Sequence, residues 1–149
     1  MKNVWTEINE NMALYFKDLL ETYDMKAVKV SLLSTALINK RFALIISIDR
    51  FEVDVYYVYR DNAGQLKILS CGSFFTEKYD SNDRQDLILV SKAGDFIINC
   101  LTVIAHGLKS KWNDMLKGDT AWMEKYKSSK WYSEMQLRPE EEKVLSQYI

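Results

Sequence analysis

The sequence is poor in the residue types on which most enzymes depend. It has one histidine, two cysteines, one proline and five glycines in 149 residues. With His106 as the only histidine, a nucleophilic triad or a histidine-rich metal site has a single candidate. His106 falls on the polar side of an expected helix, where a surface histidine is more common than a catalytic one. Cys71 and Cys100 make no disulfide framework, and we expect both thiols to be reduced.

Motifs for cofactors and metals are also absent. The chain contains no CxxC, HxxxH, GxGxxG or GxxxxGK[ST] pattern. The acidic segment DSNDRQD at 80–86 lacks the central glycine and the terminal glutamate of a calcium loop. We therefore expect no cofactor and no metal.

Long apolar runs are missing as well. No stretch approaches the roughly 18 apolar residues that a membrane span needs. The first residues, MKNVWTEINENMALYF, carry acids and amides where a signal peptide would be apolar. These features predict a cytoplasmic protein that is not held in a membrane.

What is present is the composition of an ordinary globular protein. Apolar residues make up 48% of the chain, charged residues 28%, and the net charge is −1. This length and composition predict one domain over 1–149. The balanced charge disfavours nucleic acid as the partner, because nucleic-acid binding usually requires a concentrated positive surface.

Hydrophobic periodicity predicts an α+β fold. Apolar residues recur every three or four positions between Trp5 and Tyr23, which is typical of an amphipathic helix capped by Asn3. Short β-branched and aromatic segments with brief connectors follow, and they predict an antiparallel meander, with Gly64 in one turn. The segments expected as strands are 27–34, 41–48, 51–59 and 65–72, and 87–94 is either a short fifth strand or the lead-in to a helix.

The C-terminal part is expected to be helical. An apolar stripe predicts a long helix over about 95–117 that ends at Gly118, followed by a short helix in 120–129. Pro139 and the three glutamates after it predict the start of a last helix. The expected architecture is an N-terminal helix, a four- or five-stranded antiparallel meander sheet, and C-terminal helices packed on one face.

The aromatic strand FEVDVYYVYR at 51–60 supplies the first candidate site. Strand alternation puts Phe51, Val53, Val55, Tyr57 and Tyr59 on one face, which we expect to pack under the helices. The other face is a candidate recognition surface because it combines acids, a tyrosine and an arginine. Its proposed partner-binding residues are Glu52, Asp54, Tyr56 and Arg60.

A second aromatic cluster, WMEKYKSSKWYSEM at 122–135, supplies the other candidates. Trp122 and Tyr126 are one helical turn apart and are expected to pack onto the core. Trp131 and Tyr132 are adjacent, so both side chains do not point inward together. Because tryptophan and tyrosine are enriched at interfaces, we predict that these two residues contact a protein partner.

The layout resembles a known class of binding proteins. The amphipathic N-terminal helix, the meander FALIISIDRFEVDVYYVYRDNAGQLKIL and the C-terminal segment GDTAWMEKYKSSKWYSEM resemble the small intracellular immunity proteins encoded beside bacterial polymorphic toxins. The resemblance is one of architecture over most of the chain, without a diagnostic motif. It implies a non-catalytic bacterial inhibitor that occludes a partner protein, such as a toxin domain, and it assigns no role to any single residue.

Two other functions stay open on the sequence. A small-molecule-binding protein or enzyme would use a pocket between sheet and helices, with Glu52, Asp54, His106 and Cys100 as its best residues. A nucleic-acid regulator would use the lysines interleaved with the second aromatic cluster, at 125, 127 and 130. The partner's identity and the oligomeric state do not follow from the sequence.

Overall fold

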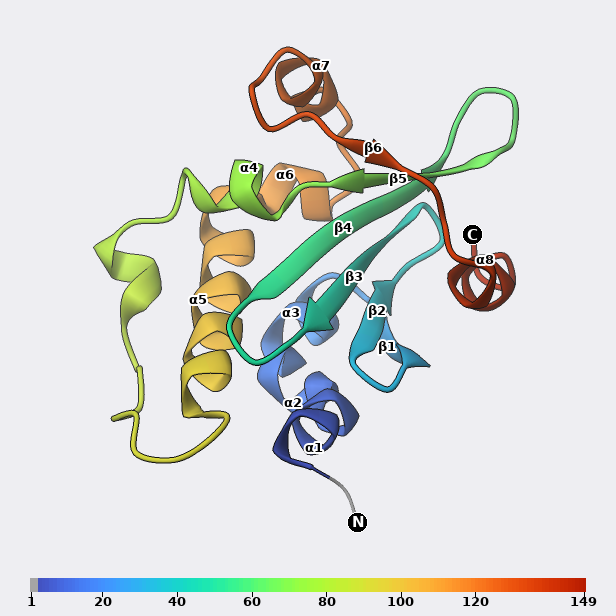
Figure 1. Cartoon of the computed structure of the whole chain (residues 1–149). Helices are drawn as coiled ribbons and strands as arrows, with labels where there is room; N and C mark the ends of the chain where they lie inside the picture. Colours follow the sequence, from blue (N-terminus) through green and yellow to red (C-terminus); the bar gives the residue numbers. More distant parts are fainter. Residues whose placement is uncertain (1–2) are drawn as a thin grey trace.

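The structure, a computed structural model, describes residues 3–149, so the first two residues of the expected domain lie outside the description. Within that range the chain forms one six-stranded antiparallel sheet whose strands lie side by side in chain order (Figure 1). The meander follows from the short connectors, because parallel neighbours would need long crossovers. The strands are β1 Lys26–Ser31, β2 Ser34–Ile38, β3 Phe42–Ile48, β4 Val53–Arg60, β5 Leu66–Ser70 and β6 Glu134–Met135.

The four predicted strands match β1, β3, β4 and β5, but the one predicted over 27–34 runs past the end of β1. The predicted number of strands, four or five, is too low, because β2 and β6 were not expected. The chain turns at residues 32–33 and forms the hairpin of β1 and β2. Asn9 holds this turn, because its side-chain amide donates to the carbonyls of Ser31 (2.9 Å) and Ser34 (3.3 Å). The turn contains neither glycine nor proline, so the sequence carries no local signal for it.

Helices occupy both ends of the chain and its middle. Asn3 caps the first helix through the backbone N–H of Thr6, and Pro139 begins the last one, as the sequence predicts. Gly64 and Gly118 both adopt positive φ, as their turn positions require. The helices are α1 Val4–Glu10, α2 Met12–Tyr15, α3 Lys17–Thr22, α4 Gly72–Thr76, the 3-10 helix η1 Ser81–Arg84, α5 Asp95–Lys111, α6 Asn113–Leu116, α7 Trp122–Lys127 and α8 Pro139–Leu145.

One further expectation is corrected, and one open alternative is decided. The helix predicted over 95–117 breaks at Trp112, whose indole N–H donates to the carbonyl of Phe75 at 3.0 Å. Residues 87–94 do not form a fifth strand; they lead into α5, and Asn99 of that helix bonds the backbone of Ile88. At Trp112 a tertiary contact overrides the local pattern.

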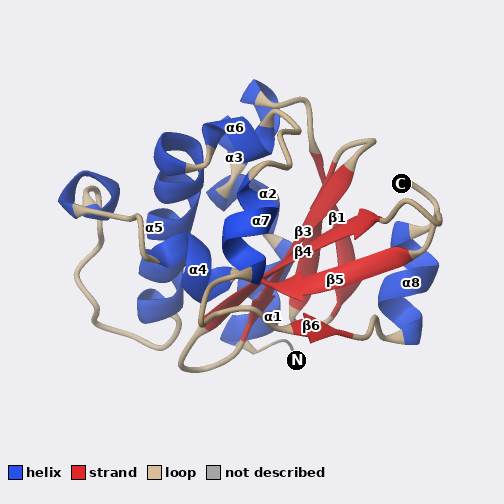
Figure 2. Ribbon diagram, turned by 90° about the horizontal axis from the view of Figure 1, so that it is seen from above, coloured by secondary structure: helices blue, strands red, loops and turns tan. Residues whose placement is uncertain are grey.

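The sheet is covered on both faces (Figure 2). The larger apolar cluster lies between one face and helices α1–α7, and it includes Val55, Tyr57, Trp122 and Tyr126 as predicted. On the opposite face, side chains of β2–β5 pack against Leu145 of α8. The prediction that the C-terminal helices share one face is therefore correct for α5–α7 and wrong for α8.

Phe51 also departs from its expected place in the core. β4 begins two residues later, and Phe51 lies in the preceding turn with 80% of its surface exposed. The carboxylate of Asp49 holds this turn by accepting from the backbone N–H groups of Phe51 (2.7 Å) and Glu52 (2.9 Å). An aromatic ring is thus presented to solvent on a well-defined turn.

Candidate functional site

Two of the predicted recognition segments meet at one hollow. Glu52 and Asp54, from the start of β4, lie with Glu77 and Trp131 around a depression of about 370 Å³. We call it the acidic hollow. Glu52 and Trp131 are almost 80 residues apart in the chain. The fold thus brings three of the predicted partner-binding residues, Glu52, Asp54 and Trp131, to one place.

The local fold explains how this hollow forms. β5 ends at Ser70, and the chain leaves the sheet beside β4, where the N–H of Cys71 donates to the carbonyl of Val55 at 2.9 Å. The hydroxyl of Tyr126 then donates to the carbonyl of Ser70 (2.8 Å) and accepts from the N–H of Ser133 (2.9 Å). These bonds hold the segment around Trp131 close to the end of β5, beside the start of β4.

The acidic hollow carries negative charge. Three carboxylates line it, and among the residues that the structure describes no lysine or arginine does. Burial, and then the nearby charge of Asp49, raise the pKa of Asp54, while a hydrogen bond with Tyr56 opposes the shift. The indole N–H of Trp131 donates to the carboxylate of Glu77. The arrangement suits a cationic group with an apolar stem, because carboxylates and an aromatic ring both attract such a group.

An apolar hollow of about 480 Å³ adjoins the acidic one. Its walls include Phe51, Leu87, Phe96, Cys100 and Val103. The rings of Phe51 and Phe96 are 80% and 52% exposed. Burial raises the pKa of the Cys100 thiol, so this thiol is neutral at physiological pH. Glu52 and Arg84 also line this hollow and bring one charge of each sign.

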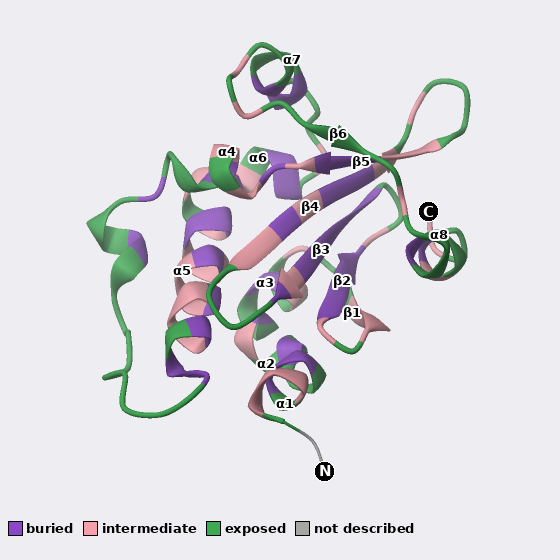
Figure 3. Cartoon of the chain, in the orientation of Figure 1, coloured by how far each residue is buried: buried purple, intermediate pink, exposed green. Residues whose placement is uncertain are grey.

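Beside this hollow, four consecutive apolar side chains face solvent. Residues 87–90 read LILV, and Leu89 is 89% exposed. In Figure 3 the connection between η1 and α5 is exposed along most of its length. Contiguous exposed apolar surface of this kind is uncommon on a monomeric protein.

Polar contacts hold this exposed segment in place. The side-chain amide of Asn99 donates to the carbonyl of Ile88 and accepts from its N–H, both at 2.9 Å. The carboxylate of Asp95 accepts from the N–H groups of Ser91 (2.9 Å) and Lys92 (3.0 Å). The apolar side chains are therefore presented from a braced backbone, which lowers the entropy that binding would cost.

The two hollows form one continuous surface, because Glu52, Val53 and Thr76 line both. We call the acidic hollow, the apolar hollow and the segment 87–90 together the docking surface. It combines a cluster of negative charge with an apolar area directly beside it.

The other predicted partner-binding residues lie outside both hollows. Tyr56 is half-buried and packs against the cluster under α8. Arg60 donates to the carbonyls of Ile149 (2.9 Å) and Gly64 (2.7 Å), so it holds the C-terminus to the sheet. Tyr132 donates to the carboxylate of Glu134 at 2.9 Å. Each of these three has a structural contact of its own.

The residues considered for catalysis are only partly brought together, because Glu52 lines both hollows whereas His106 lies apart from them. Glu52 and Asp54 line the acidic hollow and Cys100 lines the apolar hollow, whereas His106 lies in a separate groove beside Asp18. Residues 3–149 contain no group of three or more histidine, cysteine, aspartate or glutamate side chains arranged to hold a metal ion. The three lysines of the second aromatic cluster are exposed and line neither hollow.

Sequence reasoning missed several residues of the docking surface. Glu77 carries no recognisable pattern, and Phe96 reads as part of a helix face. The run at 87–90 gave the one usable signal, an apolar stretch bounded by the polar segments DRQD and SKAG. Its exposure depends on Asn99 and Asp95, whose contacts do not follow from local pattern.

Within residues 3–149, no helix has both the length and the apolar character to cross a membrane. Comparisons of the chain with protein-family models, with curated proteins and with solved structures found no match in any of the three.

Proposed function

We propose that this chain is a non-catalytic protein-binding module and that its partner binds the docking surface. The observation that carries the proposal is the run of exposed apolar side chains at 87–90, braced by Asn99 and continuous with two hollows. A braced apolar surface rimmed by charge is typical of a protein interface, in which apolar anchors supply most of the binding free energy.

The charge of the surface indicates the chemistry of the partner. The acidic hollow holds Glu52, Asp54 and Glu77 beside the ring of Trp131. A lysine or arginine side chain of the partner would place its charge among the carboxylates and its stem against the indole. The apolar hollow next to it would accept a neighbouring apolar side chain. We therefore propose a partner with a basic residue beside an apolar one.

We further propose that binding inhibits the partner, as the resemblance to immunity proteins implies. A binding module without a catalytic set of its own acts by covering the active site or the substrate path of what it binds. In such a bacterial system the partner would be a toxin domain, and its free form would arrest growth.

The proposal is tested by measuring how substitutions on the surface change affinity for one identified partner. The partner is captured from the native cell with the wild-type chain, identified, produced separately and titrated calorimetrically. We expect Phe51→Asp and Glu52→Lys each to weaken binding by roughly tenfold or more, because the first places a charge in an apolar contact and the second reverses a favourable charge.

Matched substitutions elsewhere serve as controls. Leu32→Asp changes a leucine that is 66% exposed in the turn between β1 and β2, and Glu21→Lys changes an exposed glutamate of α3. Both should leave affinity unchanged. Equal losses in all four variants, or in none, would reject the docking surface. A partner that does not arrest growth when expressed alone would reject the inhibitory role.

A further inference from the structure

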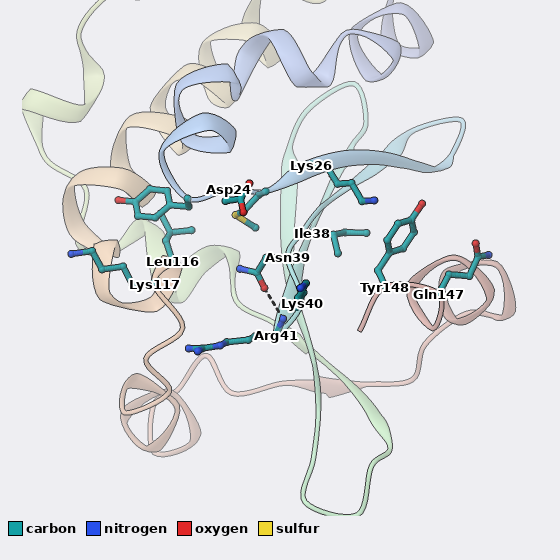
Figure 4. A pocket seen from close by; sticks show the side chains of 12 residues that line it. Asp24, Lys26, Ile38, Asn39, Lys40, Arg41, Leu116, Lys117, Gln147 and Tyr148 are labelled. Atoms are coloured by element: carbon teal, nitrogen blue, oxygen red, sulfur yellow. Dashed lines mark hydrogen bonds between the residues drawn. The ribbon is translucent and has the colours of Figure 1, made fainter.

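A third hollow shares no lining residue with the two hollows of the docking surface, and it differs from them in charge. It has a volume of about 690 Å³ and opens between the ends of several elements (Figure 4). Its lining comes from the turn before β1, the turn between β2 and β3, the end of α6 and the residues after α8. We call it the basic hollow. Its size falls in the range of small-molecule sites, about 300–1,000 Å³.

The charge of this hollow is concentrated and positive. Lys26, Lys40, Arg41 and Lys117 line it, against Asp24 as the one carboxylate in its described lining. That leaves a surplus of three positive charges on a chain whose net charge is −1. None of the ion pairs found among residues 3–149 involves any of these four cations. Their charges are therefore available to a ligand.

Two of the cationic side chains are held by aromatic or backbone contacts. The ammonium of Lys26 lies 4.3 Å from the centroid of the Tyr148 ring. Arg41 lies against the backbone of Gly118, where a Cβ atom would come within 2.6 Å of its Nη1. Gly118 also has φ +103°. Glycine is therefore favoured there both by the positive φ and by the lack of room for a Cβ atom. The Arg41 side chain therefore passes close to Gly118 at one wall of the hollow.

The turn that carries Lys40 is also well defined. The side-chain oxygen of Asn39 accepts from the N–H groups of Arg41 (2.8 Å) and Phe42 (3.0 Å), which shapes the connection between β2 and β3. In Figure 4 Lys117 and Leu116 lie on one side of the opening, with Tyr148 and Gln147 on the other. In the same view the charged ends of Lys117 and Arg41 lie on the Leu116 side and that of Lys26 lies beside Tyr148, so the positive groups come from separate elements around the opening.

We propose that the basic hollow binds a small molecule that carries several phosphate groups. Guanidinium and ammonium groups are strong hydrogen-bond donors to phosphate, and Arg41 can bind two phosphate oxygens at once. Several cations from separate elements suit a ligand with more than one phosphate, because a single phosphate would leave much of the positive surplus uncompensated. A long nucleic acid fits less well, since the net negative chain around the hollow would repel its remaining phosphates. This site is independent of the proposed partner binding.

The test is a calorimetric titration of the whole chain with sodium tripolyphosphate and with ATP at low ionic strength. We expect micromolar binding that weakens as salt is added, because exposed charges are screened. Equal affinities would identify the phosphates as the recognised group, and tighter ATP binding would add a contact with the nucleoside. Absence of binding by both ligands would overturn the proposal. Tighter binding of a single-stranded RNA oligonucleotide than of either small ligand would also overturn it.

Paired variants show whether binding occurs in this hollow. Lys40→Gln combined with Lys117→Gln removes two exposed cations from it and should weaken tripolyphosphate binding by roughly tenfold or more. Lys125→Gln combined with Lys127→Gln removes the same charge from exposed positions of α7 and should change the affinity less than about twofold. Equal weakening in the two pairs would show a general charge effect and reject the site. In the wild-type chain, the amide chemical shifts of residues 39–42 should change when tripolyphosphate is added.

Discussion

At the scale of single residues, Asp83 shows how a buried charge holds two elements together. Its side chain is 2% exposed, yet it accepts from the hydroxyl of Ser110 and from the N–H of Asp80 at 3.0 Å. Lys111 lies 3.1 Å from the same carboxylate. Burial alone would raise the pKa of Asp83, but these partners together hold it below its ordinary value of 3.8. The carboxylate thus fastens η1 to the end of α5.

The depressed pKa makes this contact sensitive to acid. Between the unfolded-state pKa and the lower folded-state pKa, the unfolded chain binds more protons, so folding stability falls as the pH is lowered. Asp83→Asn should therefore lower the free energy of unfolding at neutral pH. The difference from wild type should shrink below about pH 4, as the wild-type carboxyl becomes protonated. Urea unfolding followed by tryptophan fluorescence from pH 7 to pH 3 measures both effects.

Asp114→Asn provides the comparison for this experiment, because Asp114 is exposed on α6. Its effect should be small across the whole pH range. If the Asp83→Asn difference stayed constant down to pH 3, the stabilising role of the ionised carboxylate would be contradicted.

At the scale of elements, α5 is the helix that organises the helical side of the molecule. It buries Ile97, Leu101, Ile104 and Leu108 under the sheet, and its other contacts fix the loop before it. Gly107 lies in its interior, where glycine usually weakens a helix. The reason is packing: a Cβ at Gly107 would come within 2.3 Å of the ring of Tyr79.

Gly107→Ala should therefore destabilise the protein although alanine favours a helix. The overpacking cost is about 1–3 kcal/mol, and a contact as short as 2.3 Å puts it toward the upper end, whereas the propensity gain is up to about 1 kcal/mol. We therefore expect a net loss of about 1–2 kcal/mol. Chemical denaturation gives the free energy of unfolding. In a Tyr79→Leu background the same substitution should cost less, because the ring is gone and neighbouring effects are not additive. A stabilising Gly107→Ala would refute the packing argument.

At the scale of the whole molecule, the sheet is a central layer with helices on both faces. α8 closes the second face, where Ala36, Ile45, Val58 and Ile68 would otherwise be exposed to water. Leu145 is its fully buried contact, and Arg60 fastens the C-terminal residue to β4. A short C-terminal helix thus covers a face that the earlier helices leave open.

Leu145→Ala should lower the free energy of unfolding by about 2–5 kcal/mol, the usual cost of removing a buried leucine side chain. Ser146→Ala, at an exposed neighbouring position, should change it by no more than about 0.5 kcal/mol. Thermal and chemical unfolding of the two variants distinguish these outcomes. A small effect of Leu145→Ala would mean that α8 contributes little to the closure of this face.

Much of the fold followed from local pattern. Alternation in the strand at 51–60 correctly placed Val55 and Tyr57 in the core, because side chains on a strand point alternately to its two faces. Asn3, Pro139, Gly64 and Gly118 correctly marked helix ends and turns, because capping and positive φ are requirements of a few neighbouring residues. The antiparallel meander followed from the brief connectors.

Other features required contacts between distant segments, so local pattern could not predict them. Asn9 turns the chain between β1 and β2, and Asn99 bonds the backbone of Ile88 in the exposed segment 87–90. The hydrogen bonds of Tyr126 to Ser70 and Ser133 place Trp131 near the start of β4, where it lines the same hollow as Glu52 and Asp54.

The sequence by itself therefore determined the α+β class, most of the strands and the helix boundaries that local signals mark, because these depend on periodicity and on neighbouring residues. Only the tertiary structure decided which face α8 covers, which apolar side chains remain exposed and which charged groups share a hollow, because each of these depends on hydrogen bonds and packing between segments far apart in the chain.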